Sequence, residues 1–462
     1  MSHLDSRSRP MGLVLLTAVA MLAQPLSAVA QTAPKPTPIF WSYQFIDSVG
    51  VIIHLHNSQG FYRTQFALMK QKLLDARIKH VREGALDLNG AFNPADSAAL
   101  LQDLGRAGIK VTYIFKANVT KEFVQGFPAR VDPSFAAYEH PNELNLQRTT
   151  PWIQTLQSWA PTFAQLIRSN PATAAYPIIG PSLADMGEDP NGPLGSLEPY
   201  IDFGNLHQYY PGYNPGTQGY GRRGLAPCDA FRYGSLGYSM CHIAKVAGSK
   251  PIICTEAGFG SNPAVGHQVT PAIQAKYNSR MLMLDLKAGI PRTFLYQLAD
   301  YGTDGFGDYG QLTSTGVEKP AYKQLRGLMN ELYDVPSTGT PTALPISLSG
   351  ITTDVESLMF AKSDGSYRLV LWIEKPGYDP NANSGAGAVV EVPTQTITVS
   401  FPEPNPARRI VRFDETGALT VKDISASTPL QLMVGDNLTI VEFGRTGSAT
   451  ARPRAPVINK PL

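Results

Sequence analysis

Short apolar runs alternate with amphipathic segments from Val51 to Tyr333, and this alternation constrains the fold more than any other feature of the sequence. The alternation is typical of repeated β-α units that build a parallel sheet. Eight runs are predicted as strands: Val51–Leu55, His80–Arg82, Lys110–Phe115, Ser134–Tyr138, Pro177–Ile179, Phe203–Leu206, Pro251–Thr255 and Thr293–Tyr296.

The segments between these runs have helical periodicity, most clearly in Thr64–Ala76, Pro94–Arg106 and Trp152–Arg168. Gly108 and Gly289 stand where a glycine closes a helix before the next strand. Eight such units predict an α/β fold of the (β/α)8 TIM-barrel type. An open doubly wound sheet is the alternative, but the glycine-rich phosphate turn that usually follows its first strand is absent from the sequence after Leu55.

The pattern changes after Tyr333. A connector rich in Pro, Ser, Thr and Gly leads into runs with strand alternation and no helical period, of which Tyr367–Ile373, Gln395–Phe401 and Asn437–Phe443 are the clearest. These runs predict a small all-β sandwich. We therefore expect a barrel over 31–335, a sandwich over 343–446 and a disordered tail over 447–462.

The first thirty residues predict a cleaved signal peptide. Arg7 and Arg9 precede an apolar run, Met11–Ala23, and the small residues before Ala30 suit cleavage after that position. No other stretch approaches the roughly 20 apolar residues of a membrane span. The sequence thus predicts a secreted or periplasmic protein without an integral membrane segment in its mature chain.

Composition narrows the choice of partner. The 462 residues are 43% hydrophobic and 16% charged, and the net charge is only +2. Because Lys and Arg are scattered along the chain, a nucleic-acid partner is not expected. The three cysteines are too few for a disulfide scaffold or a zinc site: Cys254 is predicted to be a buried thiol, while Cys228 and Cys241 flank a loop and could pair.

Polar residues that follow the predicted strands are the candidates for chemistry, since TIM-barrel active sites lie at the C-terminal ends of the strands. Glu143 follows the fourth strand and Glu256 the seventh. Glycoside hydrolysis with retention needs a carboxyl proton donor and a carboxylate nucleophile about 5 to 5.5 Å apart. We expect Glu143 to be the acid/base and Glu256 the nucleophile, with mutual repulsion raising the pKa of Glu143. The residues expected to bind substrate are Arg82, Asn142, His207, Tyr209, His54, Gln297 and Tyr296.

These motifs resemble glycoside hydrolase clan A, which includes family 5 and family 39. The resemblance rests on Asn-Glu at Glu143, on Thr-Glu-x-Gly at Glu256, on His207-Gln208-Tyr209 and on Arg82. It implies cleavage of a β-glycosidic bond in an oligo- or polysaccharide, without metal or cofactor. The third strand lacks the histidine that family 5 often has, and the eighth ends at Tyr296 and Gln297 where many members have Trp, so the sugar and the family stay open.

Other interpretations remain at this point. An inactive glycan-binding or envelope-assembly protein could use the same barrel. A metal-dependent hydrolase is disfavoured, because His54-Leu55-His56 has no matching His/Asp set on the later strands. Arg82 could be a structural partner of Glu83 or Glu256, and Glu83 and Asp185 are the reserve candidates for acid/base. The loop 209–223 could bind sugar rings through Tyr210, Tyr213 and Tyr220, or be a Gly-rich insertion.

Overall fold

A computed structural model describes residues 37–56, 60–85, 94–147, 151–184, 189–301, 307–401, 407–426 and 428–444. The predicted signal peptide, the predicted tail and Asp185 lie outside these residues. Among the described residues, no helix has the length and apolar character needed to cross a membrane.

Eight parallel strands form a single sheet in the order β6-β5-β4-β3-β2-β9-β8-β7. A bridge between Ile179 and Phe203 brings the two edges of this sheet together. The nearly closed barrel confirms the predicted fold class, and each predicted strand overlaps one of its members. The strands are β2 (Val49–Ile52), β3 (His80–Gly84), β4 (Lys110–Ile114), β5 (Phe135–Glu139), β6 (Ile178–Ile179), β7 (Gly204–Tyr209), β8 (Ile252–Gly258) and β9 (Thr293–Leu295).

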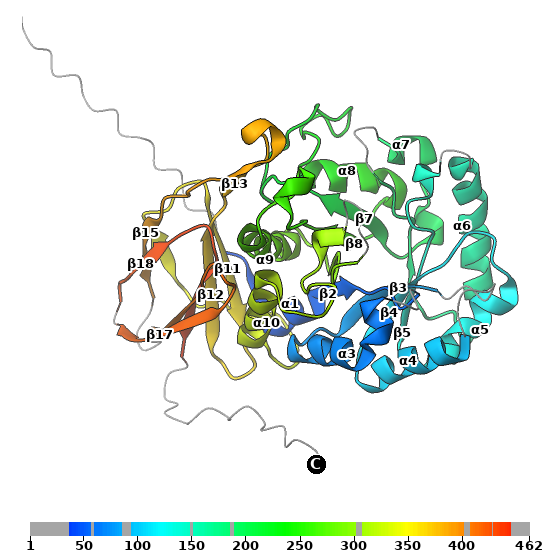
Figure 1. Cartoon of the computed structure of the whole chain (residues 1–462), viewed down its shortest axis with the longest axis horizontal. Helices are drawn as coiled ribbons and strands as arrows, with labels where there is room; N and C mark the ends of the chain where they lie inside the picture. The colour runs from blue at the N-terminus through cyan, green and yellow to red at the C-terminus, as the bar shows by residue number, and fades with distance from the viewer. Residues whose placement is uncertain are drawn as a thin grey trace, which may run out of the picture. The chain divides into compact units, whose positions relative to one another are not determined.

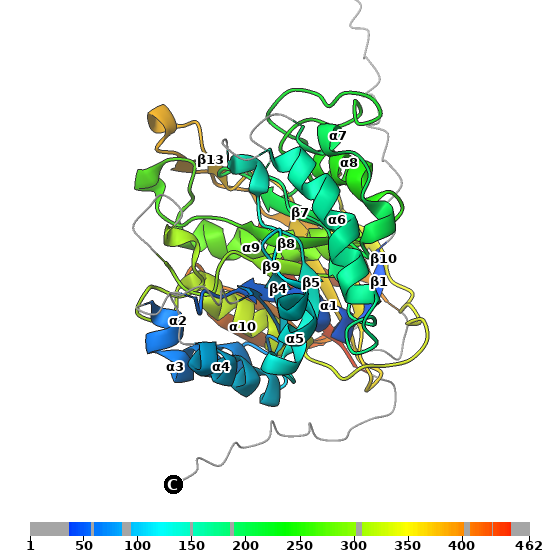
Figure 2. The same cartoon turned by 90° about the vertical axis from the view of Figure 1, so that its right-hand side faces the viewer.

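Helices connect these strands, and Figures 1 and 2 show α3, α4, α5 and α6 on the outside of the barrel. The predicted helix over 64–76 is two helices that meet at Gln65, whose φ of −120° and ψ of 36° depart from helical geometry. Gly108 and Gly289 have φ of 84° and 86°, as expected for residues that close helices. The helices are α1 (Ser42–Ser48), α2 (Phe61–Thr64), α3 (Phe66–Asp75), α4 (Pro94–Arg106), α5 (Lys121–Val131), α6 (Trp152–Arg168), α7 (Asn191–Leu194), α8 (Leu236–Ala247), α9 (Pro271–Lys287) and α10 (Pro320–Leu332).

Helix α6 packs on the barrel through one apolar stripe, which follows from the spacing of apolar residues in its sequence. Its buried residues recur every three or four positions, so they form one stripe that faces the barrel. Each large apolar side chain buried in this way contributes on the order of 1.5–3 kcal/mol. The stripe consists of Leu156, Trp159, Ala160, Phe163, Ala164 and Ile167.

The described residues after α10 fold into β-strands and contain no α-helix, as predicted. One sheet has the order β1-β11-β12-β19-β16-β17, a second has the order β10-β15-β18, and β13 pairs with β14. The first strand, β1, precedes the barrel in sequence but pairs in parallel with β11. The strands are β1 (Ile39–Trp41), β10 (Ser347–Ser349), β11 (Val355–Ala361), β12 (Tyr367–Ile373), β13 (Tyr378–Asp379), β14 (Ala388–Val389), β15 (Gln395–Ser400), β16 (Ala407–Phe413), β17 (Leu419–Ala426), β18 (Leu430–Val434) and β19 (Thr439–Phe443).

The cysteines behave as the sequence suggested. Cys228 and Cys241 form a disulfide, with their Cα atoms 5.7 Å apart. Cys254 is a buried free thiol in β8. The disulfide joins the long β7–α8 connection to helix α8.

Candidate active site

Glu143 lies just beyond the end of β5, in a backbone conformation that favours glycine. Its φ is 42° and its ψ is 44°, which is left-handed. Residues with a side chain adopt this region at a cost, and such strain is concentrated at functional sites. The amide of Glu143 donates to the carbonyl of Ser182 at 3.1 Å, which ties this turn to the chain that follows β6.

Glu256 lies in β8, where the pairing with the neighbouring strands is irregular. The register with β7 shifts so that Leu206 pairs with Cys254 while His207 pairs with Glu256. Thr255 is therefore an extra residue in the ladder. Adjacent residues of a regular strand point to opposite faces, but a bulge redirects them. This explains why both Thr255 and Glu256 contact residues of the site.

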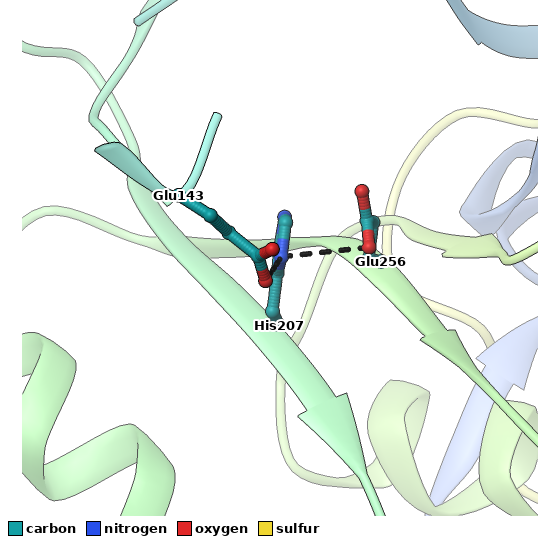
Figure 3. A group of neighbouring side chains, drawn as sticks. All are labelled: Glu143, His207 and Glu256. Carbon is teal, nitrogen blue, oxygen red and sulfur yellow. Dashed lines mark hydrogen bonds and ion pairs between the residues drawn. The ribbon is translucent and has the colours of Figure 1, made fainter. Parts of the chain in front are cut away.

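The two glutamates lie on either side of His207, and their carboxylates point toward it (Figure 3). His207 Nδ1 is 2.8 Å from Glu143 Oε1 and 3.6 Å from Glu256 Oε2. One ligating atom from each of the three residues lies within 4.8 Å of the others. The carboxyl groups are thus closer than the roughly 6.5–9.5 Å that an inverting mechanism needs to place a water between them.

Arg82 is a buried residue that donates a hydrogen bond to Glu256, the candidate nucleophile. Its Nη1 donates to Glu256 Oε1 at 2.6 Å, and its Nη2 donates to Asn142 Oδ1 at 2.6 Å. The side chain is 1% exposed. Burial alone would lower the pKa of this guanidinium, but the negative charges of Glu139 and Glu256 raise it above its usual value. Arg82 is therefore a permanent buried cation at the site, and its carboxylate partners are Glu139 and Glu256 rather than Glu83.

Glu139 was missed by the sequence analysis, although it makes the densest set of contacts under the site. It is fully buried and accepts two hydrogen bonds from Arg82, at 2.9 and 2.7 Å. Asn205 Nδ2 donates to it at 2.9 Å, and Thr255 Oγ1 lies 3.1 Å away. A signal was present: Glu139 comes two positions after Ala137, whose side chain packs in the apolar cluster inside the barrel, so a charged side chain on that face needed a buried cation.

Thr255 determines which nitrogen of His207 carries hydrogen. Its single hydroxyl hydrogen has two acceptors, Asn205 Oδ1 at 2.7 Å and Glu139 Oε1 at 3.1 Å. Its oxygen can therefore only accept from His207 Nε2, at 3.1 Å. Nδ1 is left to share one proton with Glu143 Oε1. That proton lies either on the carboxyl or on the imidazole.

The charge of this pair alters the expected protonation of Glu143. Burial of the carboxyl would raise its pKa, but the hydrogen bond and charge of His207, together with the charge of Arg82, lower it below its usual value. The expected rise through repulsion from Glu256 is therefore wrong for the protein without substrate. The reason is distance, because His207 Nδ1 lies between the two carboxylates and is closest to Glu143.

Tyr209 and Tyr296 line the other side of Glu256. The Tyr209 hydroxyl donates to Glu256 Oε2 at 2.8 Å. Burial, followed by the charge of Glu256, raises the pKa of this phenol well above its usual value, so it remains a donor. The Tyr209 and Tyr296 rings meet edge to face at 6.4 Å, and Tyr309 packs against both.

His54 and Gln297 complete the predicted set at the mouth. The His54 ring stacks on Tyr301 at 4.8 Å and meets Tyr296 edge to face. Burial, with the positive charge of His56, lowers the pKa of His54 to about 3, so the ring stays neutral. Gln297 is fully buried and accepts from Tyr62 at 3.0 Å.

Two other candidates, Glu83 and Tyr210, make their contacts away from the two glutamates. Glu83 accepts from the Leu55 amide at 2.5 Å and lies 3.0 Å from His56 Nδ1, which commits its carboxylate to the turn after β2. Tyr210 is buried against Phe259, so the suggestion that its ring binds sugar is wrong.

Glycine at position 258 is required by the end of the neighbouring strand. A Cβ at Gly258 would lie 2.6 Å from the carbonyl oxygen of Tyr296. The motif Thr-Glu-x-Gly thus lets β8 carry Glu256 while β9 passes close behind it.

Glu143, His207 and Glu256 are also the one His and carboxylate cluster, among the described residues, with the spacing of metal ligands. Both nitrogens of His207 already have partners, and Arg82 donates to Glu256. A divalent ion would displace these bonds and lie beside a buried guanidinium, which is costly. The donor set fits proton transfer and nucleophilic attack better than metal binding.

Comparisons with known proteins address the fold. No family model and no curated protein matches the sequence. A family 39 glycoside hydrolase from the gut symbiont Bacteroides cellulosilyticus WH2 has a similar structure, with a TM-score of 0.59 and 14% identity over 87% of this chain and 82% of that chain. The chain has the family 39 glycoside hydrolase fold.

This likeness confirms the fold that the resemblance to clan A implied. Two further structures are less similar: an active-site mutant of Rhizomucor miehei β-1,3-glucanosyltransferase in complex with laminaritriose, and a GH2 β-galacturonidase from Eisenbergiella tayi bound to glycerol. Their TM-scores are 0.41 and 0.44, their identities 13% and 14%, and they cover 61% and 63% of this chain and 97% and 51% of their own.

Proposed function

We propose that the protein is an exported retaining glycoside hydrolase that cleaves a β-glycosidic bond by double displacement. One observation carries the proposal: carboxylates from opposite sides of a barrel mouth meet around a single histidine, with ligating atoms within 4.8 Å. This spacing suits direct attack on the anomeric carbon.

In the first step Glu256 attacks the anomeric carbon while Glu143 protonates the leaving oxygen. Arg82 and Tyr209 each donate a hydrogen bond to one oxygen of Glu256 and so hold its carboxylate in one orientation. The proton comes from the Glu143 and His207 pair. Binding of the sugar places the leaving oxygen beside Glu143, so the proton is used from the carboxyl oxygen that faces the substrate.

In the second step Glu143 acts as a base. The aglycone has departed, and a water takes its place next to the carboxylate. Glu143 removes a proton from this water as its oxygen attacks the covalent glycosyl ester of Glu256. The proton taken from the water returns the Glu143 and His207 pair to its starting protonation, and Thr255 holds the orientation of His207 throughout.

The nature of the substrate follows from the resemblance to clan A and from the uncharged aromatic wall of Tyr296 and Tyr309. We infer an oligo- or polysaccharide, with sugar rings packing their C–H faces on these rings.

The alternative function is glycan binding without turnover. Purified protein incubated with a panel of β-linked aryl glycosides and plant and bacterial polysaccharides separates the two, with Glu256→Gln as the matched control. Binding without any release of reducing ends would favour the alternative.

Export is a separate part of the proposal and rests on the sequence before Gln31. Expression of the full chain in a bacterial host should yield a mature protein that starts at Gln31 and lies outside the cytoplasm. Mass spectrometry of the fractions checks this, and an uncleaved chain in the cytoplasm would remove the signal-peptide assignment.

A further inference from the structure

Glu374, at the end of β12 in the sandwich, is anchored to barrel elements by an unusually full set of hydrogen bonds. Its carboxylate is 7% exposed. It accepts from Arg280 Nε at 2.8 Å and also from Arg280 Nη2. Trp372 Nε1, two residues earlier in the sandwich, donates at 2.8 Å. Arg280 is a fully buried residue of α9, so the two charges neutralise each other inside the protein.

The same carboxylate also holds the connection between β7 and α8. Asn214 Nδ2 donates to Glu374 Oε1 at 2.7 Å, and the Gly216 amide donates to the same oxygen at 3.0 Å. The positive charge of Arg280 is sufficient to balance the negative charge of Glu374. The hydrogen bonds from Asn214 and Gly216 are not needed for that balance, and their effect is to fix the position of the loop.

This loop begins directly after Tyr209, the residue that donates to Glu256. It runs from 210 to 235, longer than the roughly 12–15 residues beyond which an irregular connection is uncommon without a function. A second sandwich residue, Asn381, donates from Nδ2 to the Tyr213 hydroxyl at 2.9 Å. Gly212 lies so close to the sandwich that a Cβ there would be 2.8 Å from Pro380 Cβ.

The anchored part of the loop presents a pair of stacked rings. Tyr213 and Tyr220 lie 4.3 Å apart with an interplanar angle of 10°. Neither ring is fully buried. Stacked tyrosines on a fixed backbone form a rigid surface on which sugar rings can pack.

We propose that Glu374 is a positioning residue that holds the loop 210–220 as an extension of the substrate site, so that the sandwich sets the affinity for substrates longer than the sugar at the cleavage point. The proposal rests on the proposed function. It assigns the sandwich a part in substrate binding and not only in stability.

The test uses the full chain with three variants. Asn214→Ala removes a loop bond and leaves the Arg280 ion pair intact, whereas Glu374→Gln also changes the charge balance. Lys287→Met is the matched control, because Lys287 pairs with Glu356 between α9 and β11 without touching the loop. Since a hydrogen bond to a charged group is at stake, Asn214→Ala should raise KM for a polysaccharide about ten-fold, with a much smaller rise for an aryl monoglycoside.

A second readout needs no activity. Arg222 and Arg223 are exposed in the loop, so trypsin reports its opening. Cleavage there should be at least several-fold faster in Asn214→Ala and Glu374→Gln than in the wild type and Lys287→Met. Equal KM changes for long and short substrates, or wild-type rates of cleavage in the loop variants, would overturn the proposal. A wild type that hydrolyses no glycan would refute the proposed function. The trypsin result would still show whether Glu374 holds the loop 210–220 in place.

Discussion

Arg82 and Glu139 are joined by two parallel hydrogen bonds beneath the candidate active site, Nε to Oε2 at 2.9 Å and Nη2 to Oε1 at 2.7 Å. Both side chains are buried. The remaining terminal nitrogen of Arg82 donates to Glu256. The orientation of the proposed nucleophile therefore depends on a carboxylate that does not touch the substrate.

Replacing Glu139 should damage both stability and activity. Glu139→Gln leaves a buried guanidinium with one carboxylate fewer, which costs about 3–5 kcal/mol of unfolding free energy when one partner of a buried pair is removed. A displaced Arg82 would reorient Glu256, with a loss of about 100-fold in kcat. Urea unfolding and initial rates measure the two effects. Glu318→Gln, which breaks partly exposed pairs with Lys72 and Arg326, is the control and should cost about 1 kcal/mol or less for each pair.

Glu256→Ala should abolish turnover by several powers of ten, since no covalent intermediate can form. Azide can then enter the space left by the carboxylate and attack the anomeric carbon from the same side as Glu256. The product should be a glycosyl azide of inverted configuration, identified by NMR. Near wild-type turnover in Glu256→Ala would assign the nucleophile elsewhere.

Sequence periodicity was sufficient for most of the fold. Helices α4 and α6 have the predicted bounds, because apolar stripes at three- and four-residue spacing determine which segments can cover a barrel. Glu143 and Glu256 could be proposed as catalytic residues from the sequence, because the C-terminal ends of all barrel strands lie at one face.

The layer under the site could not be predicted in the same way. The partners of Glu139 come from three other strands, and no local pattern links them. The bulge that brings Thr255 to the same site as Glu256 breaks the two-residue alternation on which strand prediction depends. The lowered pKa of Glu143 depends on the 2.8 Å contact with His207 and on the charge of Arg82, and both residues lie far from Glu143 in the sequence.

The pH dependence of stability should contain a contribution from Asp285, a buried residue of α9. Burial raises its pKa to about 7, although Thr293 donates to it at 2.9 Å. In the unfolded chain the group ionises near its usual value of 3.8. The folded protein therefore holds an extra proton between about pH 4 and pH 7, and stability falls as pH rises through this window.

Asp285→Asn mimics the protonated side chain at every pH. The variant should be more stable than the wild type at pH 8, by a few kcal/mol, and should lose the decline between pH 4 and pH 7. Thermal unfolding across this range measures the slope. Asp229→Asn, at an exposed position, is the control. A slope identical in wild type and Asp285→Asn would mean that Asp285 is ionised in the folded protein.

The role of Glu143 can be separated from that of Glu256 by the leaving group. If Glu143 supplies the proton, Glu143→Ala should be severe for substrates with poor leaving groups, which cannot depart as bare alkoxides. Activated aryl glycosides need no proton, so they should still form the intermediate. They should then stall, because the same residue must activate the water in the second step.

Glu143→Ala should therefore give a burst of released phenol followed by slow turnover, measured by stopped-flow absorbance. The pH profile adds an independent check. The proton used in the first step belongs to the Glu143 and His207 pair, so the basic limb of the wild-type profile reports the pair and not one residue. Removing Glu143 should abolish that limb for activated substrates. Equal losses for all leaving groups, with no burst and an unchanged basic limb, would show that Glu143 is not the acid/base. Asp185 would then be the next residue to test, because the carboxylate of Glu83 is bound to the turn after β2.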